Sequence, residues 1–263
     1  MFFFILVCTS LLFSQQQFPL IIAHRGASAD VPENTIAAFK EALNQRADAI
    51  EIDVRLTADS QLVVIHDSNV KRTTNGSGNV AELTLHDMRN LDAGSWFSPK
   101  FSGEKIPTLK EVLSILDSTT LLIIEIKSEL EGIEQKVINE VDAAGKRKQI
   151  LLKSFYPDVI KTFQRLAPDI PRVYVFAFHI PWLNFTFGTR PRFENVFETT
   201  AEYLQIHRLA ITKSFVEKAH HHKYKVIVWG VDTEDGMKEM IELGVDGIET
   251  AHPKLLRTIL MEK

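Results

Sequence analysis

Short runs of apolar and β-branched residues recur along the chain, separated by stretches in which apolar residues repeat with helical spacing. Nine such runs follow Gln17, at residues 20–24, 49–56, 62–67, 121–127, 150–155, 172–178, 203–207, 225–231 and 247–250. Helical patterns separate most of them, at residues 34–46, 109–117, 130–144, 157–166, 212–222 and 233–243. This alternation is typical of an α/β protein with a parallel sheet.

The number and spacing of the runs favour a closed barrel. The residues after position 17 of this 263-residue chain match the size of a (β/α)8 barrel, about 250 residues. Nine runs compete for eight barrel strands, and the link 57–61 is too short to hold a crossover helix. We therefore expect the run 62–67 to be irregular and to lie beside the preceding strand. The sequence predicts a (β/α)8 TIM barrel over residues 18–263, with a small turn-rich insertion at about 68–107.

The N-terminal segment is uncharged and strongly apolar. Eleven of the first 13 residues are hydrophobic, and three glutamines follow Ser14. This run is too short to span a bilayer comfortably, so we interpret residues 1–17 as a cleaved secretory leader and expect a secreted or periplasmic protein. The run lacks the basic residue that normally starts a leader, which leaves an uncleaved membrane anchor or a buried first strand as alternatives. Lipid attachment at Cys8 is a further alternative.

The overall charge narrows the range of partners. Thirty basic and 34 acidic side chains give a formal charge of −4, so no positive field is available to hold nucleic acid. We expect no nucleic-acid partner and no stable membrane insertion once the leader is removed. Cys8 is the single cysteine, so no intramolecular disulfide can form. The oligomeric state stays open.

Carboxylates alternate with apolar residues in two of the predicted strands. Glu51 and Asp53 lie two residues apart and therefore point to one face, and Glu125 and Lys127 repeat this spacing. Burying such acids costs several kcal/mol for each unpaired charge, so a positive group must face them. Three carboxylates without cysteine suit a hard cation, Ca2+ or Mg2+. Pairing with arginine and lysine alone is the alternative.

Two histidines, His24 and His66, end strand runs, where barrel enzymes place their catalytic residues. A lone histidine in a strand is more often a hydrogen-bonded core residue. These histidines, however, would meet the carboxylates and two cations, Arg25 and Lys127, at the mouth of a barrel. Histidines for proton transfer, a metal ion and cations for a phosphoryl group together indicate phosphodiester cleavage.

Motifs spread over the chain resemble one known family. They are His24-Arg-Gly26, Pro32-Glu-Asn-Thr35, Glu51-x-Asp53, His66-Asp67, Thr73-Thr-Asn-Gly76, Ile106-Pro-Thr-Leu109, Glu125-Ile-Lys127, Trp229-Gly-Val231 and Gly244-Val-Asp-Gly-Ile248. In this order they are similar to the glycerophosphodiester phosphodiesterases. The resemblance implies a barrel enzyme that hydrolyses glycerophosphodiesters to an alcohol and sn-glycerol 3-phosphate, with one divalent cation, Ca2+ or Mg2+.

The resemblance also implies roles for individual residues. His24 and His66 correspond to the general acid and base, and Arg25 and Lys127 to the phosphate-binding cations. The metal ligands correspond to Glu51, Asp53 and Glu125, supported by Glu33 and Asn34 from a surrounding shell. Trp229, on the run 225–231, is either a core residue or part of the substrate wall, and we assign it to substrate binding.

Two other functions fit parts of the sequence. A lysophospholipase D-like enzyme would use the same residues with an added apolar trough, which Phe178, Trp182, Phe185 and Phe187 would line. Comparing turnover of glycerophosphocholine and lysophosphatidylcholine discriminates between the two activities. A non-catalytic phosphodiester-binding barrel would have lost a histidine or a carboxylate, and none is lost here.

The leader makes a direct prediction about the mature protein. Mass spectrometry of the natively expressed protein should find an N-terminus between about Ser14 and Phe18, the region where a leader of this length ends. An intact Met1 on the soluble protein would contradict export by a cleaved leader.

Overall fold

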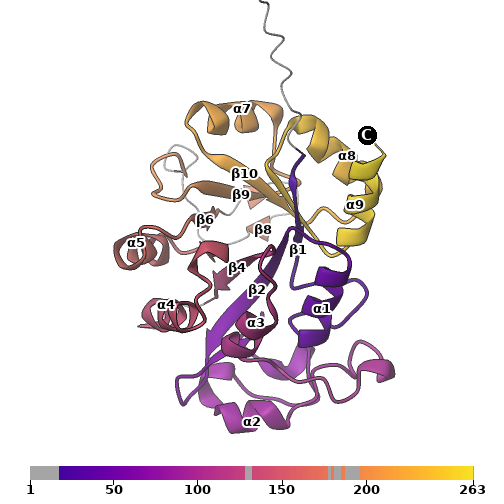
Figure 1. Ribbon diagram of the computed structural model, residues 1–263, viewed down its shortest axis with the longest axis vertical. Helices are drawn as coiled ribbons and strands as arrows, with labels where there is room; N and C mark the ends of the chain where they lie inside the picture. Colours follow the sequence, from indigo (N-terminus) through magenta and orange to yellow (C-terminus); the bar gives the residue numbers. More distant parts are fainter. Residues whose placement is uncertain (1–17, 128–131, 177–178, 181–184, 187–195, 263) are drawn as a thin grey trace, which may run out of the picture.

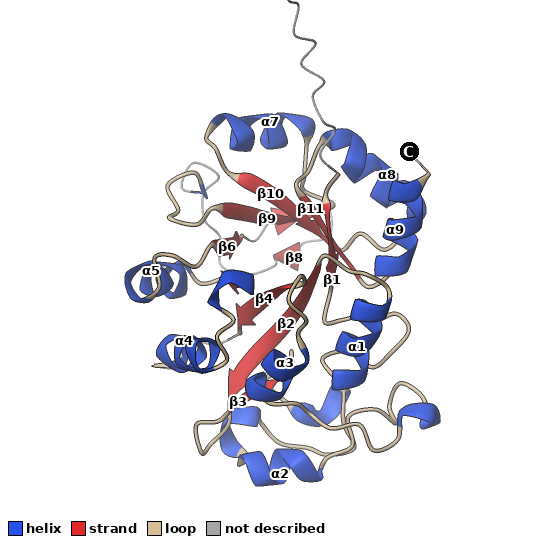
Figure 2. Ribbon diagram, viewed as in Figure 1, coloured by secondary structure: helices blue, strands red, loops and turns tan. Residues whose placement is uncertain are grey.

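Eight parallel strands close into a barrel surrounded by helices (Figure 2). The computed structural model describes residues 18–127, 132–176, 179–180, 185–186 and 196–262, with side chains given outside 177–195. The predicted leader, residues 1–17, lies outside these ranges, as do Phe178, Trp182 and Phe187 and the side chain of Phe185.

The barrel strands follow the order predicted from the apolar runs. They are β1 (Leu20–Ala23), β2 (Ala49–Leu56), β4 (Leu121–Ile126), β5 (Ile150–Ser154), β6 (Arg172–Val175), β9 (Tyr203–His207), β10 (Lys225–Trp229) and β11 (Gly247–Thr250). Each pairs in parallel with its neighbours, and the pairing of β1 with both β2 and β11 closes the ring. This confirms the predicted TIM barrel.

The run 62–67 is not a barrel strand, as the short link before it suggested. β3 (Leu62–Val64) pairs antiparallel with the end of β2 and leaves the barrel at its mouth. Another short antiparallel pair, β7 (His179–Ile180) and β8 (Phe185–Thr186), lies outside the nine-stranded sheet.

Helices surround the barrel in the positions expected from the periodic stretches (Figure 1). They are α1 (Ile36–Asn44), α3 (Leu109–Ile115), α4 (Ile133–Ala143), α5 (Pro157–Leu166), α7 (Lys213–His221), α8 (Glu234–Leu243) and α9 (Pro253–Met261). The sequence patterns above did not include α9, which begins with Pro253 and packs on β1 and α8. In the part of the chain that the structure describes, no helix is long and apolar enough to cross a membrane.

Threonines start most of the helices that follow strands or turns. The hydroxyl of Thr35 accepts a hydrogen bond from the Ala38 amide at the start of α1, and Thr108 forms a capping box with Glu111 at the start of α3. Such a cap contributes about 1 kcal/mol to stability. The caps set where the connections from the strands end, and therefore the lengths of the loops at the barrel mouth.

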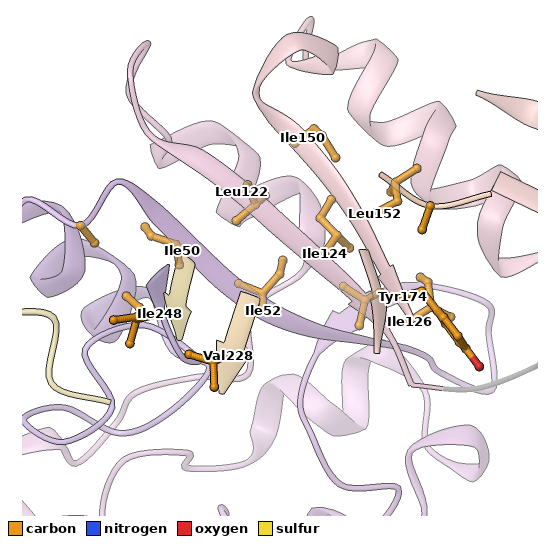
Figure 3. Packing of buried hydrophobic residues seen from close by; sticks show 14 of the residues in the cluster. Ile50, Ile52, Leu122, Ile124, Ile126, Ile150, Leu152, Tyr174, Val228 and Ile248 are labelled. Atoms are coloured by element: carbon orange, nitrogen blue, oxygen red, sulfur yellow. The ribbon is translucent and has the colours of Figure 1, made fainter. Parts of the chain in front are cut away.

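The two faces of each strand enter different parts of the core. Ile50, Ile52, Leu122 and Ile124 point outward, where they pack under the helices in the larger hydrophobic cluster (Figure 3). Residues of the alternate positions fill the barrel itself with a separate apolar cluster. Its buried members are Ile22, Ala49, Ile123, Leu151, Val173 and Ile227. One side-chain layer closer to the carboxyl ends, the inward residues become polar.

The segment after β3 has a hydrophobic core of its own. It holds three single-turn 3-10 helices, Val70–Arg72, Val80–Glu82 and Pro99–Phe101, and helix α2 (Leu85–Asn90). Its apolar side chains form a cluster that is distinct from the two barrel clusters and consists of Val63, Ile65, Val70, Val80, Met88, Ala93 and Ile106. The small insertion expected after the second histidine motif is therefore present as a separately packed unit.

The turn after β1 depends on a glycine. Gly26 has φ of +84°, and a Cβ there would lie 2.7 Å from backbone and side-chain carbons of Ala38 in α1. We expect Gly26→Ala to lower the free energy of unfolding by about 3 kcal/mol, through left-handed strain and overpacking. Urea denaturation measures this change.

Gly132 offers the matched control. Its φ is +82°, but a Cβ there would meet no atom within 4 Å. Gly132→Ala should therefore cost only about 1 kcal/mol, the backbone strain alone. Equal losses in the two variants would show that the contact with α1 contributes nothing.

Candidate active site

A cavity of about 250 Å3 opens at the carboxyl ends of the barrel strands. Residues from β1, β4, β5, β6, β10 and β11, together with His66 beyond β3, line it. The lining residues are His24, Arg25, His66, Glu125, Lys127, Lys153, Phe155, Val175, Trp229 and Glu249. The closed ring thus brings together residues more than 200 positions apart in the sequence.

The three carboxylates predicted to bind metal converge beside this cavity. Glu51, Asp53 and Glu125 are buried, and each offers an oxygen within 4.8 Å of an oxygen of the others. Parallel pairing places Asp53 directly opposite Glu125 on adjacent strands. All three point into the barrel because inward positions alternate along a strand.

This donor set fits a hard divalent cation. Asp53 Oδ1 and Glu125 Oε1 are buried, accept no hydrogen bond of normal geometry from the described residues and face the ammonium of Lys127, at 3.2 and 2.5 Å. Buried carboxylate oxygens with ligand capacity to spare are what Ca2+ or Mg2+ requires. The residues that would hold such an ion are therefore Glu51, Asp53 and Glu125.

The surroundings of Asp53 and Glu51 shift the pKa values of the two carboxylates in opposite directions. Burial alone would raise the pKa of Asp53, but Lys127 and Arg25 bring it well below its usual range. Burial raises the pKa of Glu51 well above its usual range, even though Lys153 lies beside it. Asp53 is therefore the more firmly ionised of the two.

Two charged residues in the barrel were not among the predicted site residues. Lys153 on β5 places its ammonium 3.2 Å from Glu51 Oε1, 3.0 Å from Glu125 Oε2 and 3.0 Å from Glu249 on β11. Lys153 is the single charged residue of β5, Ile150–Ser154, and Glu249 is that of β11, Gly247–Thr250. A lone charged residue inside a strand run was the only local signal for either of them.

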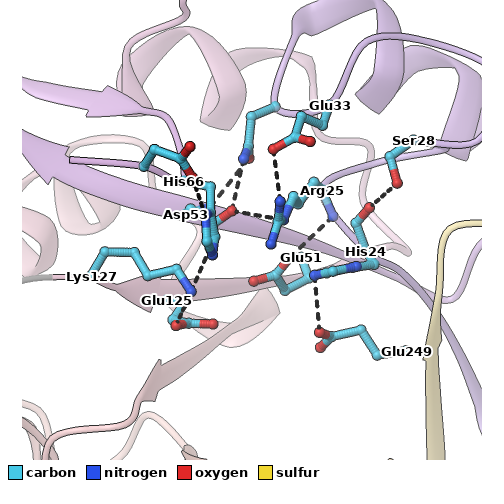
Figure 4. A network of polar contacts seen from close by, with 12 residues as sticks. His24, Arg25, Ser28, Glu33, Glu51, Asp53, His66, Glu125, Lys127 and Glu249 are labelled. Atoms are coloured by element: carbon cyan, nitrogen blue, oxygen red, sulfur yellow. Dashed lines mark hydrogen bonds and ion pairs between the residues drawn. The ribbon is translucent and has the colours of Figure 1, made fainter. Parts of the chain in front are cut away.

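His24 follows the last residue of β1 and lines the cavity. Its side chain is 25 % exposed, and its Nε2 lies 3.8 Å from Glu249 Oε1 (Figure 4). Burial lowers the pKa of His24 to about 4, although Glu249 opposes this shift. The imidazole is therefore neutral near pH 7 and able to accept a proton.

His66 reaches the same cavity from outside the ring of parallel strands. Its Nδ1 lies 2.6 Å from Asp67 Oδ1, and Asp67 in turn accepts hydrogen bonds from Arg72 at 2.6 and 3.0 Å. Burial lowers the pKa of His66, against the effect of Asp53. The Asp67 contact fixes the ring orientation and leaves Nε2 as the nitrogen for chemistry.

Glu33 and Asn34, predicted to support the site, contact residues of the cavity and of the carboxylate triad. Asn34 donates a hydrogen bond of 2.7 Å to Asp53 Oδ2. Glu33 accepts one of 2.8 Å from Arg25 and two of 2.8 Å from Arg72. Arg25 also lies 3.3 Å from Asp53 through Nε, and its amide donates to Glu51 (Figure 4). Arg72, which the sequence reasoning missed, therefore links the two histidine motifs.

The remaining wall of the cavity is apolar. Phe155, Val175 and Trp229 line it opposite the charged residues, and the Lys127 ammonium lies 5.5 Å from the Phe155 ring centroid. Trp229 contacts the ring of His207 edge-on, with centroids 4.5 Å apart. The structure therefore places Trp229 at the cavity, with its indole both packed in the barrel mouth and available to a ligand.

A parallel barrel that gathers histidines, carboxylates and cations at the carboxyl ends of its strands is the architecture of a TIM-barrel enzyme. The model of the glycerophosphoryl diester phosphodiesterase family matches residues 24–255. A glycerophosphodiester phosphodiesterase of Caldanaerobacter subterraneus subsp. tengcongensis is 40% identical over 243 residues, covering 90% of this chain and 96% of that protein.

Solved structures agree with the sequence comparison. A putative glycerophosphoryl diester phosphodiesterase of Silicibacter pomeroyi superposes with a TM-score of 0.82 and 25% identity, covering 94% of each chain. An Oleispira antarctica phosphodiesterase, solved in complex with the product sn-glycerol-3-phosphate, gives 0.80 and 27% identity, covering 93% of this chain and 97% of that one. The chain belongs to the glycerophosphoryl diester phosphodiesterase family and is a phosphodiesterase.

Proposed function

We propose that this protein hydrolyses glycerophosphodiesters to an alcohol and sn-glycerol 3-phosphate, with a divalent cation and with His24 and His66 as proton-transfer residues. The observation that carries the proposal is that one cavity is lined by both histidines, by Glu125 of the carboxylate triad and by Arg25 and Lys127. The substrate class comes from the 40% identical relative. The product complex of the Oleispira antarctica enzyme supports it further.

The charges of the site suit a phosphodiester monoanion. Arg25 presents a guanidinium at the cavity and Lys127 an ammonium, and both can pair with phosphoryl oxygens. A cation bound by Glu51, Asp53 and Glu125 would act as a Lewis acid on the phosphoryl group. Because Asp53 and Glu33 fix Arg25 from two sides, this side chain is held in place before substrate arrives.

The two histidines divide the proton transfers. Cleavage of the phosphodiester requires that the attacking hydroxyl lose a proton and that the leaving alkoxide gain one. His24 approaches from β1 and His66 from the antiparallel hairpin, so the two rings enter the cavity from different elements. One works neutral as the base and the other protonated as the acid, although burial lowers the pKa of both rings in the free protein.

The alternative of a lysophospholipase D-like activity has no support among the described residues. Its proposed apolar trough, Phe178, Trp182, Phe185 and Phe187, falls on side chains outside the described part of the chain. The apolar wall of the cavity, formed by Phe155, Val175 and Trp229, suffices for the glycerol carbons or a small alcohol. We further propose that the enzyme acts after export, on the evidence of its apolar N-terminal run.

Chelation should abolish turnover of glycerophosphocholine. Without a cation the phosphoryl group lacks its Lewis acid. The melting temperature should also fall on chelation, because a ligand bound only to the folded state stabilises it. Calorimetry and a choline-release assay measure the two effects. Full activity of the metal-free protein in excess chelator would refute metal dependence.

Replacing either histidine should reduce catalysis far more than binding. We expect His24→Ala and His66→Ala each to lower kcat by about 10²- to 10⁴-fold while the fold survives. The pH profile of kcat/KM should be bell-shaped in the wild type and lose one limb in each variant. His220→Ala serves as the control, since His220 pairs with Asp246 at a helix end and lies outside the cavity.

A near-normal kcat in His66→Ala with a raised KM would make His66 a binding residue. The same outcome in both variants would remove histidine catalysis altogether. A loss of kcat that keeps both limbs of the pH profile would likewise contradict proton transfer by the replaced residue.

A further inference from the structure

Lys153 is the most completely enclosed cation in the described part of the barrel. Its side chain is 3 % exposed, and its ammonium contacts Glu51, Glu125 and Glu249 at 3.0 to 3.2 Å. The side chain therefore carries a full positive charge at the floor of the cavity.

Two of the three partners of Lys153 belong to the proposed metal site, and the third does not. Glu249 is buried, accepts from Lys153 with both oxygens and accepts a further hydrogen bond of 2.7 Å from Gln205. Two other ionisable groups lie near Glu249: the His24 ring, whose Nε2 is 3.8 Å away, and Glu51, which offers an oxygen within 4.8 Å. The carboxylate of Glu249 therefore forms its main ion pair with Lys153.

A structural role alone gives little reason for this buried pair. One layer below, the same inward positions of β4, β5 and β6 hold Ile123, Leu151 and Val173, which fill the barrel without any charge. Replacing a buried ion pair by apolar side chains is often neutral or stabilising. The pair of Lys153 and Glu249 is therefore better explained by its effect on the neighbouring carboxylates.

We propose that Lys153 and Glu249 form a fixed charge pair that sets the cation affinity of the Glu51–Asp53–Glu125 triad. Lys153 neutralises the triad when no cation is bound, and its charge opposes the entry of one. Glu249 offsets that charge, so that the triad still attracts a divalent ion. The inference rests on the proposed metal site, and both residues act on it as positioning and charge-setting groups through Glu51 and Glu125.

Variants that remove one charge at a time should shift cation affinity in opposite directions. Isothermal titration of Ca2+ and of Mg2+ into metal-stripped protein should show about tenfold tighter binding in Lys153→Met and about tenfold weaker binding in Glu249→Gln. A unit charge at a partly screened distance of several Å has about this effect. The double variant should return to within about threefold of wild type.

Thermal unfolding provides a second measurement that does not depend on activity. In chelator, Lys153→Met should melt below wild type because three buried carboxylates then lack their shared cation. Addition of Ca2+ should raise its melting temperature by more than it raises that of wild type. Gln205→Leu is the matched control, because it removes a neutral partner of Glu249 from the same layer and should leave cation affinity within about twofold.

The outcomes separate this inference from the metal site itself. If wild type binds the cations but both single variants shift affinity in the same direction, or neither shifts by more than about twofold, the charge pair is refuted and the metal site stands. If Lys153→Met does not fold, an unchanged affinity in Glu249→Gln refutes the pair, and a weakened affinity restored in the double variant supports it. If wild type binds neither cation, both ideas fail.

Discussion

The balance of charge inside the barrel is the constraint on which the site depends. Glu51, Asp53, Glu125 and Glu249 are almost wholly buried, and each would cost several kcal/mol if left unpaired. Lys153 on the inside and Lys127 toward the mouth supply the opposing charge. The layer beneath them, which includes Leu151, is apolar and buried. The site is therefore a polar layer above an apolar layer, and the register of the strands sets how deep in the barrel the polar layer lies.

Much of this arrangement follows from alternation along single strands. The spacing of Glu51 and Asp53, and the place of His24 at a strand end, were enough to predict residues that the closed ring then brings together. Lys153 and Glu249 were not predicted because each is the only charged residue of its strand. They become partners only when the barrel closes and brings β5 and β11 opposite each other. An ion pair across the barrel depends on how the strands close into a ring, and no pattern within one strand predicts it.

The connection between the two histidine motifs is likewise a tertiary feature. Glu33 binds both Arg25 and Arg72, and Arg72 binds Asp67, which contacts His66. These contacts hold the loop after β1 against the insertion. Substitutions at Arg72 would therefore act on His66 at a distance, through the orientation of Asp67. This network gives the predicted supporting role of Glu33 a physical meaning, because its carboxylate bridges the guanidinium groups of Arg25 and Arg72.

The position of β3 divides the site between two hydrophobic cores. His24 and the carboxylates lie on or directly after strands of the closed barrel, whereas His66 follows β3, which takes part in both cores. Val63 and Ile65 pack within the insertion, and Leu62 and Val64 pack in the outer cluster of the barrel. Arg55 on β2 also donates a hydrogen bond of 2.8 Å to the backbone carbonyl of His66. The position of His66 relative to the carboxylates therefore depends on the packing of the insertion as well as on the barrel, and a substitution in either core can change it.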